Sequence, residues 1–97
     1  MPEYARVATF EVDEAALAAM LAAINASDGP PPGVPAKRIT VLADRAAGKV
    51  VVAVRFGSED DLRAGGAVLD AMDPPEGGSM RRVSVESYEV ALEMQAP

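Results

Sequence analysis

The segment from Ile39 to Leu62 constrains the fold of this chain most strongly, because it combines a β-hairpin pattern with the start of a capped helix. Two runs rich in β-branched residues, 39–43 and 49–56, flank a short segment that ends in Gly48, a residue able to adopt positive φ. Ser58 then follows the second run and can cap the first amides of a new helix. The segment therefore predicts two antiparallel strands and a helix in direct succession.

Similar patterns precede and follow this segment. Residues 4–12 are rich in β-forming residues, and Asp13 can cap a helix that carries one apolar stripe and ends near Asn25. A second helix is predicted from Ser58 to about Met72, and a final strand follows it. The order strand, helix, strand, strand, helix, strand predicts an α+β protein with the ferredoxin-like βαββαβ topology. We therefore expect a four-stranded antiparallel sheet with two helices on one face.

The domain organisation follows from the length. A chain of 97 residues can bury one modest hydrophobic core, so residues 1–97 are predicted to form a single domain. The segment 29–35, rich in proline and glycine, is predicted to be a loop. A linker between two domains is the alternative interpretation, but neither side of the segment is long enough for a core of its own.

Composition excludes several classes of protein. The chain has no cysteine and no histidine, which removes disulfides, thiolate metal sites and the commonest general base, so we expect no metal and no cofactor. A net charge of -6 repels phosphate backbones and argues against nucleic acid as a partner. The chain lacks both the run of about 20 apolar residues that spans a membrane and the basic start of a secretion signal. These features predict a cytoplasmic protein without membrane contact.

The run from Lys49 to Phe56 is apolar on both faces of its strand. Even-numbered valines and Phe56 share one face, while Val51 and Ala53 lie on the other. Two helices can cover only one side of the sheet, and a face exposed to water would normally alternate with polar residues. A second sheet would cover the remaining face economically, so we predict a homodimer.

Two local features leave two interpretations each. The pair Gly65-Gly66 lies in the middle of the second predicted helix, either to let that helix approach the sheet or to admit a ligand. In the last strand the apolar alternation changes phase between Val85 and Tyr88. This change predicts either a bulge near 86–87 or a strand that leaves its own sheet and contacts a partner subunit.

Four segments together resemble a known family: PGV at 32–34, LADRAAGK at 42–49, RFGSEDDL at 55–62 and VESYEV at 85–90. They are similar to the small antibiotic biosynthesis monooxygenase-like proteins of the dimeric α+β barrel superfamily. The resemblance implies a homodimer with facing sheets and exchanged C-terminal strands, and a small pocket in each protomer. Val34 replaces a common aromatic residue, and Phe56 stands where tryptophan is frequent. Haem degradation, which some members perform, is improbable because the chain has neither histidine nor tryptophan.

The functional expectation is a small-molecule-binding protein, and whether it is an enzyme is left open. The alternative is a cofactor-independent oxygenase that acts on an aromatic or quinone-like compound, because the resembling family includes such enzymes. Arg6, Arg55 and Tyr88 are the candidate substrate-binding residues, since they could hold the anion of such a compound. Their ordinary interpretation is surface ion pairing for the arginines and packing at a dimer seam for the tyrosine.

Other sites and classes fit less well. The acidic run 59–61 resembles a metal cluster, but acidic residues in the first turn of a helix are explained by the helix dipole. An RNA-recognition domain shares the topology but needs exposed aromatic residues and basic charge. An amino-acid-binding regulatory domain also shares it, but such a domain usually belongs to a larger enzyme.

Overall fold

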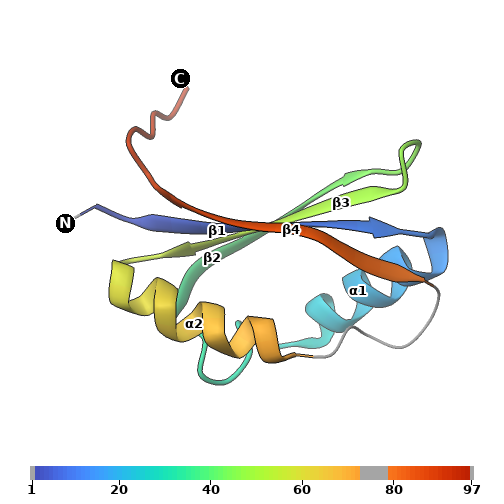
Figure 1. The fold of residues 1–97 in the computed structure, drawn as a ribbon, viewed down its shortest axis with the longest axis horizontal. Coiled ribbons are helices and arrows are strands. Elements are labelled where there is room, and N and C mark those ends of the chain that lie inside the picture. The colour runs from blue at the N-terminus through green and yellow to red at the C-terminus, as the bar shows by residue number, and fades with distance from the viewer. Residues whose placement is uncertain (1, 73–78, 97) are drawn as a thin grey trace.

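The fold of this chain, in a computed structural model that describes residues 2–72 and 79–96, has the predicted topology. Its elements are β1 (Tyr4–Val12), α1 (Glu14–Ala26), β2 (Ala36–Asp44), β3 (Lys49–Phe56), α2 (Glu59–Ala71) and β4 (Met80–Glu89). The strands form one antiparallel sheet in the order β2-β3-β1-β4, and both helices lie on the same face of it (Figure 1). The α+β ferredoxin-like fold is therefore confirmed.

The local signals act as the sequence predicts. The Asp13 carboxylate accepts a hydrogen bond from the Ala16 amide at 2.8 Å, and the Ser58 hydroxyl accepts one from the Asp61 amide at 3.1 Å, so each cap fixes the start of its helix. Gly48 closes the hairpin with φ of +64°, and a Cβ there would lie 3.1 Å from the Val12 carbonyl oxygen. This turn needs glycine.

The hydrophobic core consists of two clusters on the helix side of the sheet. The first lies under α1 and is built on Leu17, Met20 and Val50, which are buried. The second lies beside α2 and is built on Val34, Val54 and Phe56. Val52 packs against both clusters and connects them.

The glycine pair of α2 is explained by close packing. Gly65 is buried, and the ring of Phe56 lies directly against it, so α2 approaches the sheet as the first interpretation predicts. Gly66 leaves room for a different neighbour, since a Cβ there would lie 3.9 Å from Cδ of Arg6.

β2 begins three residues earlier than the run 39–43 indicates. It starts at Ala36, which pairs with Phe56, and an irregularity in the pairing lies between Ala36 and Arg38. The charged residues of this segment have no strong β preference, so the backbone pairing offered by the end of β3 decides their conformation.

The last strand differs from both interpretations of its phase change. β4 remains paired with β1 from Met80 to Glu89, and its irregularity lies at Val83, opposite the step from Thr9 to Phe10, rather than at 86–87. Val83, Val85 and Tyr88 are 50%, 38% and 49% exposed. β4 is an edge strand without a buried side chain, so its apolar residues are not confined to one face of the sheet. The alternation of apolar residues along β4 therefore does not indicate how the strand pairs with β1.

None of the helices in the described ranges is long and apolar enough to cross a membrane.

Candidate functional site

A cavity of about 1250 Å³ lies between the helices and the sheet, in the gap between the two core clusters. Its sheet side includes the small residue Ala8, which is fully buried, and its walls are mostly apolar. Representative lining residues are Phe10, Met20, Ile39, Val52, Leu69 and Met80. All six elements and the proline-rich loop contribute to the lining, so a large apolar space is built from the whole fold.

The edge of the cavity is open to solvent. Ile24 near the end of α1 and Met72 after α2 line it while being 37% and 50% exposed. The loop between α1 and β2 adds Pro30, Pro31 and Pro32 to the same edge. Val34 is buried against the second core cluster and anchors this loop. The proline-rich segment therefore forms part of the entrance.

Arg6 brings a positive charge into this apolar space. It belongs to β1, opposite Val54 and Ser87, and its side chain is 7% exposed. Nη2 of Arg6 donates a hydrogen bond to Oδ1 of Asp70 at 2.6 Å. Asp70 lies in the last turn of α2, and its own side chain is 55% exposed. A buried cation is thus balanced by a carboxylate that remains in contact with water.

A second arginine shares this carboxylate. Nη1 of Arg82, from β4, lies 3.4 Å from the same Oδ1 atom of Asp70. Arg6, Asp70 and Arg82 all line the cavity, and this group of two guanidiniums and one carboxylate carries one excess positive charge. An anionic group of a ligand would be attracted to this position, because Coulomb interactions strengthen where water is excluded. The other charged residues in the lining are Asp28, Lys37 and Arg38.

The structure does not bring the three predicted site residues together. Only Arg6 lines the cavity, whereas Arg55 and Tyr88 lie on the opposite face of the sheet, where both pair with Ala5. The register explains the separation: Arg6 pairs with Val54, so Arg6 and Arg55 project from opposite faces.

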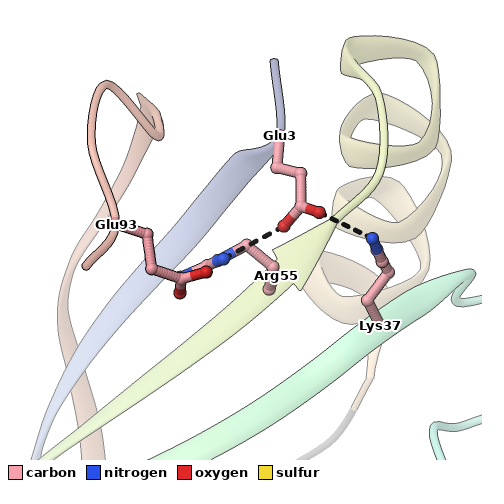
Figure 2. Close-up of polar contacts among 4 residues, drawn as sticks. All are labelled: Glu3, Lys37, Arg55 and Glu93. Atoms are coloured by element: carbon pink, nitrogen blue, oxygen red, sulfur yellow. Dashed lines mark hydrogen bonds and ion pairs between the residues drawn. The ribbon is translucent and has the colours of Figure 1, made fainter. Parts of the chain in front are cut away.

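Arg55 belongs to an ion-pair cluster instead. Its guanidinium donates to Glu93 at 2.8 Å and to Glu3 at 3.0 Å, and Lys37 donates to the other oxygen of Glu3 at 2.6 Å (Figure 2). The hydrogen bond from Lys37, followed by that from Arg55, lowers the pKa of Glu3, and the bond from Arg55 lowers the pKa of Glu93. These bonds also raise the pKa of Arg55, with Glu93 as the larger cause.

Tyr88 is half exposed and donates a hydrogen bond from its hydroxyl to Glu86 at 2.6 Å. This bond raises the pKa of Tyr88, because losing the phenolic proton would place two negative charges side by side. Neither Arg55 nor Tyr88 is therefore positioned to act on a molecule in the cavity.

Asp70 and Arg82, which form the charged group with Arg6, are not among the site residues that the sequence predicts. The same holds for the other charged lining residues, Asp28, Lys37 and Arg38. One signal was present for Asp70, because an acidic residue in the last turn of a helix opposes the helix dipole and calls for a specific partner. For Arg82 the sequence carries no comparable signal, since it is one of two adjacent arginines in an exposed edge strand.

Metal binding finds no support in the described part of the chain, where acidic residues nowhere gather in a group of three or more that could hold an ion.

Comparisons of this chain with protein-family models, with curated proteins and with solved structures found no match.

Proposed function

We propose that this protein binds a small molecule whose apolar body fills the helix-side cavity and whose anionic oxygen pairs with Arg6. The observation that carries this proposal is the position of Arg6, a nearly buried guanidinium in the wall of a mostly apolar cavity. A buried charge is costly unless it is paired, and Asp70 pairs with it from a partly exposed position. A bound anion would take over that pairing, while Asp70 keeps Arg82 as its partner.

The dimensions of the cavity favour a ligand with a sizeable hydrocarbon framework. Its volume of about 1250 Å³ exceeds the 300–1,000 Å³ or so of common ligand pockets. A fused-ring aromatic carboxylate or phenolate combines such a framework with a single anionic oxygen. This is the ligand class that we propose.

A cofactor-independent oxygenase is the second candidate function, and the same Arg6 favours it. A phenol or hydroquinone bound there would have its oxyanion stabilised by the guanidinium, which favours loss of the proton. The substrate would supply all the electrons that reduce dioxygen, so that one oxygen atom is inserted into the ring, which becomes a quinone, and the other leaves as water. Histidine and cysteine are absent, so the acidity of the substrate would have to drive proton loss.

We also propose that this chain is related to the antibiotic biosynthesis monooxygenase-like proteins. This proposal rests on the four sequence segments that resemble that family and on a fold and a protomer pocket of the kind that the resemblance implies.

The binding proposal is tested with two probes that share one ring system. 2-Naphthoate carries a carboxylate, whereas 2-naphthalenemethanol is neutral, and calorimetry measures the affinity of the protein for each. We expect Arg6→Met to weaken naphthoate binding at least tenfold and to leave naphthalenemethanol binding nearly unchanged. Arg63→Met, at an exposed position on α2, is the matched control and should change neither affinity.

Equal loss of affinity for both probes in Arg6→Met would contradict the anion-pairing role, as would naphthoate binding that Arg6→Met does not weaken. Oxygen consumption with a hydroquinone substrate separates the two candidate functions. Turnover that depends on Arg6 would favour the oxygenase, and binding without turnover would favour the binding protein.

A further inference from the structure

Two adjacent arginines in β4 lie on opposite faces of the sheet. Arg81 pairs with Glu11 and lies on the face away from the helices, where the two side chains form an ion pair. Arg82 pairs with Phe10 and lies on the helix side, among the residues that line the cavity. Because side chains alternate along a strand, only one of these two arginines can serve the cavity.

The bulge at Val83 decides which arginine that is. Ser84 pairs with Thr9, and both lie on the face opposite the helices. In a regular strand Arg82 would share a face with Ser84, because the two residues are two positions apart. Val83 is left out of the pairing with β1, which reverses this relationship and directs Arg82 to the cavity. Bulges are enriched next to functional sites, where they re-aim a side chain in this way.

Arg6 and Arg82, here called the arginine pair, approach one another from neighbouring strands. Nη2 of Arg6 lies 2.6 Å from Oδ1 of Asp70, and Nη1 of Arg82 lies 3.4 Å from the same atom. Two nitrogen atoms that reach a single oxygen are close enough to bind the two oxygens of one carboxylate. A guanidinium has five N–H donors, so Arg82 can donate to a ligand and keep its contact with Asp70.

The other charged residues of the lining leave the arginine pair unchanged. The ammonium of Lys37 pairs with Glu3 at 2.6 Å. Arg38 pairs with Arg55 in the sheet and therefore projects from the opposite face. Asp28 belongs to the proline-rich loop at the entrance. The charge beside a bound ligand is therefore that of two guanidinium groups and one carboxylate, with one positive charge in excess.

We propose that the ligand is a monocarboxylate whose two oxygens bind Arg6 and Arg82, one on each guanidinium, and that Asp70 excludes dianions. This inference rests on the proposed function and narrows its ligand class from carboxylate or phenolate to carboxylate. A phenolate has one oxygen and would have to take the position of Oδ1 of Asp70 to reach both arginines. A monoanion neutralises the excess positive charge, whereas a dianion leaves a negative charge in a space with little water.

The position of the arginine pair also sets the direction of the ligand. The pair lies on β1 and β4, and the apolar lining continues through Val52 on β3 to Ile39 on β2. β2 lies two strand spacings from β1, roughly 10 Å, which accommodates a fused-ring body that lies across the strands. The side chain of Arg82 is 44% exposed and that of Arg6 is 7% exposed, so Arg82 is the outer member of the pair.

Adjacent arginines on opposite faces provide the test with a matched control. Calorimetry at pH 8 measures the affinity of each variant for 2-naphthoate and for the neutral 2-naphthalenemethanol. Arg82→Met should weaken naphthoate binding by about fivefold or more, because it removes a hydrogen bond to a charged group. Arg81→Met should leave naphthoate binding unchanged. Neither variant should change the affinity for naphthalenemethanol, which also shows that the cavity is still formed.

2-Naphthyl phosphate tests the role of Asp70, because pH 8 lies above the second pKa of about 6 of such a phosphate and makes it a dianion. The wild-type protein should bind it more weakly than naphthoate. Asp70→Asn removes one negative charge and should raise the affinity for the phosphate about fivefold more than the affinity for naphthoate. Asp60→Asn, at an exposed position in the first turn of the same helix, is the control and should change neither affinity.

The outcomes separate this inference from the proposed function. A wild-type protein that binds neither naphthoate nor naphthalenemethanol would overturn both. Naphthoate binding that depends on Arg6 but is unchanged in Arg82→Met would overturn the carboxylate bridge alone, as would equal losses in Arg82→Met and Arg81→Met. Wild-type protein that binds the naphthyl phosphate as tightly as naphthoate would overturn the exclusion of dianions and leave the proposed function standing.

Discussion

The ring of Phe56 lies directly against the backbone of Gly65, so that a Cβ at position 65 would come within 2.9 Å of Cζ of that ring and still closer to Cε1. Phe56 is fully buried at the end of β3, and Gly65 is buried in the middle of α2. This contact sets the distance between α2 and the sheet. It therefore also shapes the part of the cavity wall that carries Leu69 and Asp70.

Gly65→Ala and Gly66→Ala should differ in their effect on stability. Both substitutions gain about 1 kcal/mol of helix propensity, but only the one at 65 forces a methyl group into Phe56, which costs about 1–3 kcal/mol. We expect Gly65→Ala to be less stable than Gly66→Ala by about that amount in urea unfolding monitored by circular dichroism. Equal stability of the two variants would show that α2 does not pack as closely as the structure has it.

Asp13 connects the start of α1 to the start of β4, since its carboxylate accepts hydrogen bonds from the amides of Ala16 at 2.8 Å and Ser79 at 2.9 Å. Asp13→Ala should lower the free energy of unfolding by about 0.5–2 kcal/mol. Asp13→Asn retains one acceptor oxygen and should lose less. A loss in Asp13→Asn as large as that in Asp13→Ala would show that charge, rather than capping, accounts for the effect.

The sequence predicts most of the fold because its strongest signals are local. The side chains of Asp13 and Ser58 each accept a hydrogen bond from the amide three residues along the chain, and Gly48 adopts the positive φ that its turn requires. These features can be recognised without knowing which distant residues are neighbours in the fold. The register of the edge strand β4 has no such local determinant. Its position relative to β1 depends on the bulge at Val83, which exposed side chains do not specify.

The candidate site depends on distant contacts, and for that reason the sequence predicts little of it. Arg6 and Asp70 are 64 residues apart and meet only because α2 packs across β1. Arg6 and Arg55 look alike in sequence, since both are single arginines in β-forming runs. Because Arg6 pairs with Val54, Arg6 and Arg55 lie on opposite faces of the sheet. A shift of one residue in the register of β1 and β3 would have placed both arginines on the same face.

Asp70→Asn should strengthen binding of an anionic probe. Asp70 competes with a bound anion for Arg6, and asparagine keeps a hydrogen-bond acceptor without the negative charge. We expect the affinity for 2-naphthoate to rise by up to about tenfold and the affinity for 2-naphthalenemethanol to stay unchanged. Weaker naphthoate binding in Asp70→Asn would indicate that Asp70 positions Arg6 for the ligand instead of competing with it.

Acid should release the C-terminal tail. Glu3 and Glu93 have lowered pKa values in the folded protein, so their ion pairs with Arg55 contribute stability above the ordinary glutamate pKa of about 4.3 and lose it as the pH falls further. Heteronuclear NOE values of Leu92 and Met94 should therefore fall below pH 4 or so, while β1 and β3 amides still report a folded sheet. In Glu93→Gln the tail should be mobile already at neutral pH. A tail that stays rigid in that variant would contradict the role of this ion pair.

Chemical-shift mapping with 2-naphthoate tests the ligand cavity most directly. The probe is titrated into ¹⁵N-labelled protein, and amide shifts are compared between the helix side of the sheet and the opposite face, which neither helix covers. We expect saturable shifts at residues that line the cavity and no shifts around Arg55 and Tyr88; the lining residues to follow are Arg6, Phe10, Met20, Leu69 and Arg82. Shifts confined to the neighbourhood of Arg55 and Tyr88, or none at millimolar probe, would contradict this expectation.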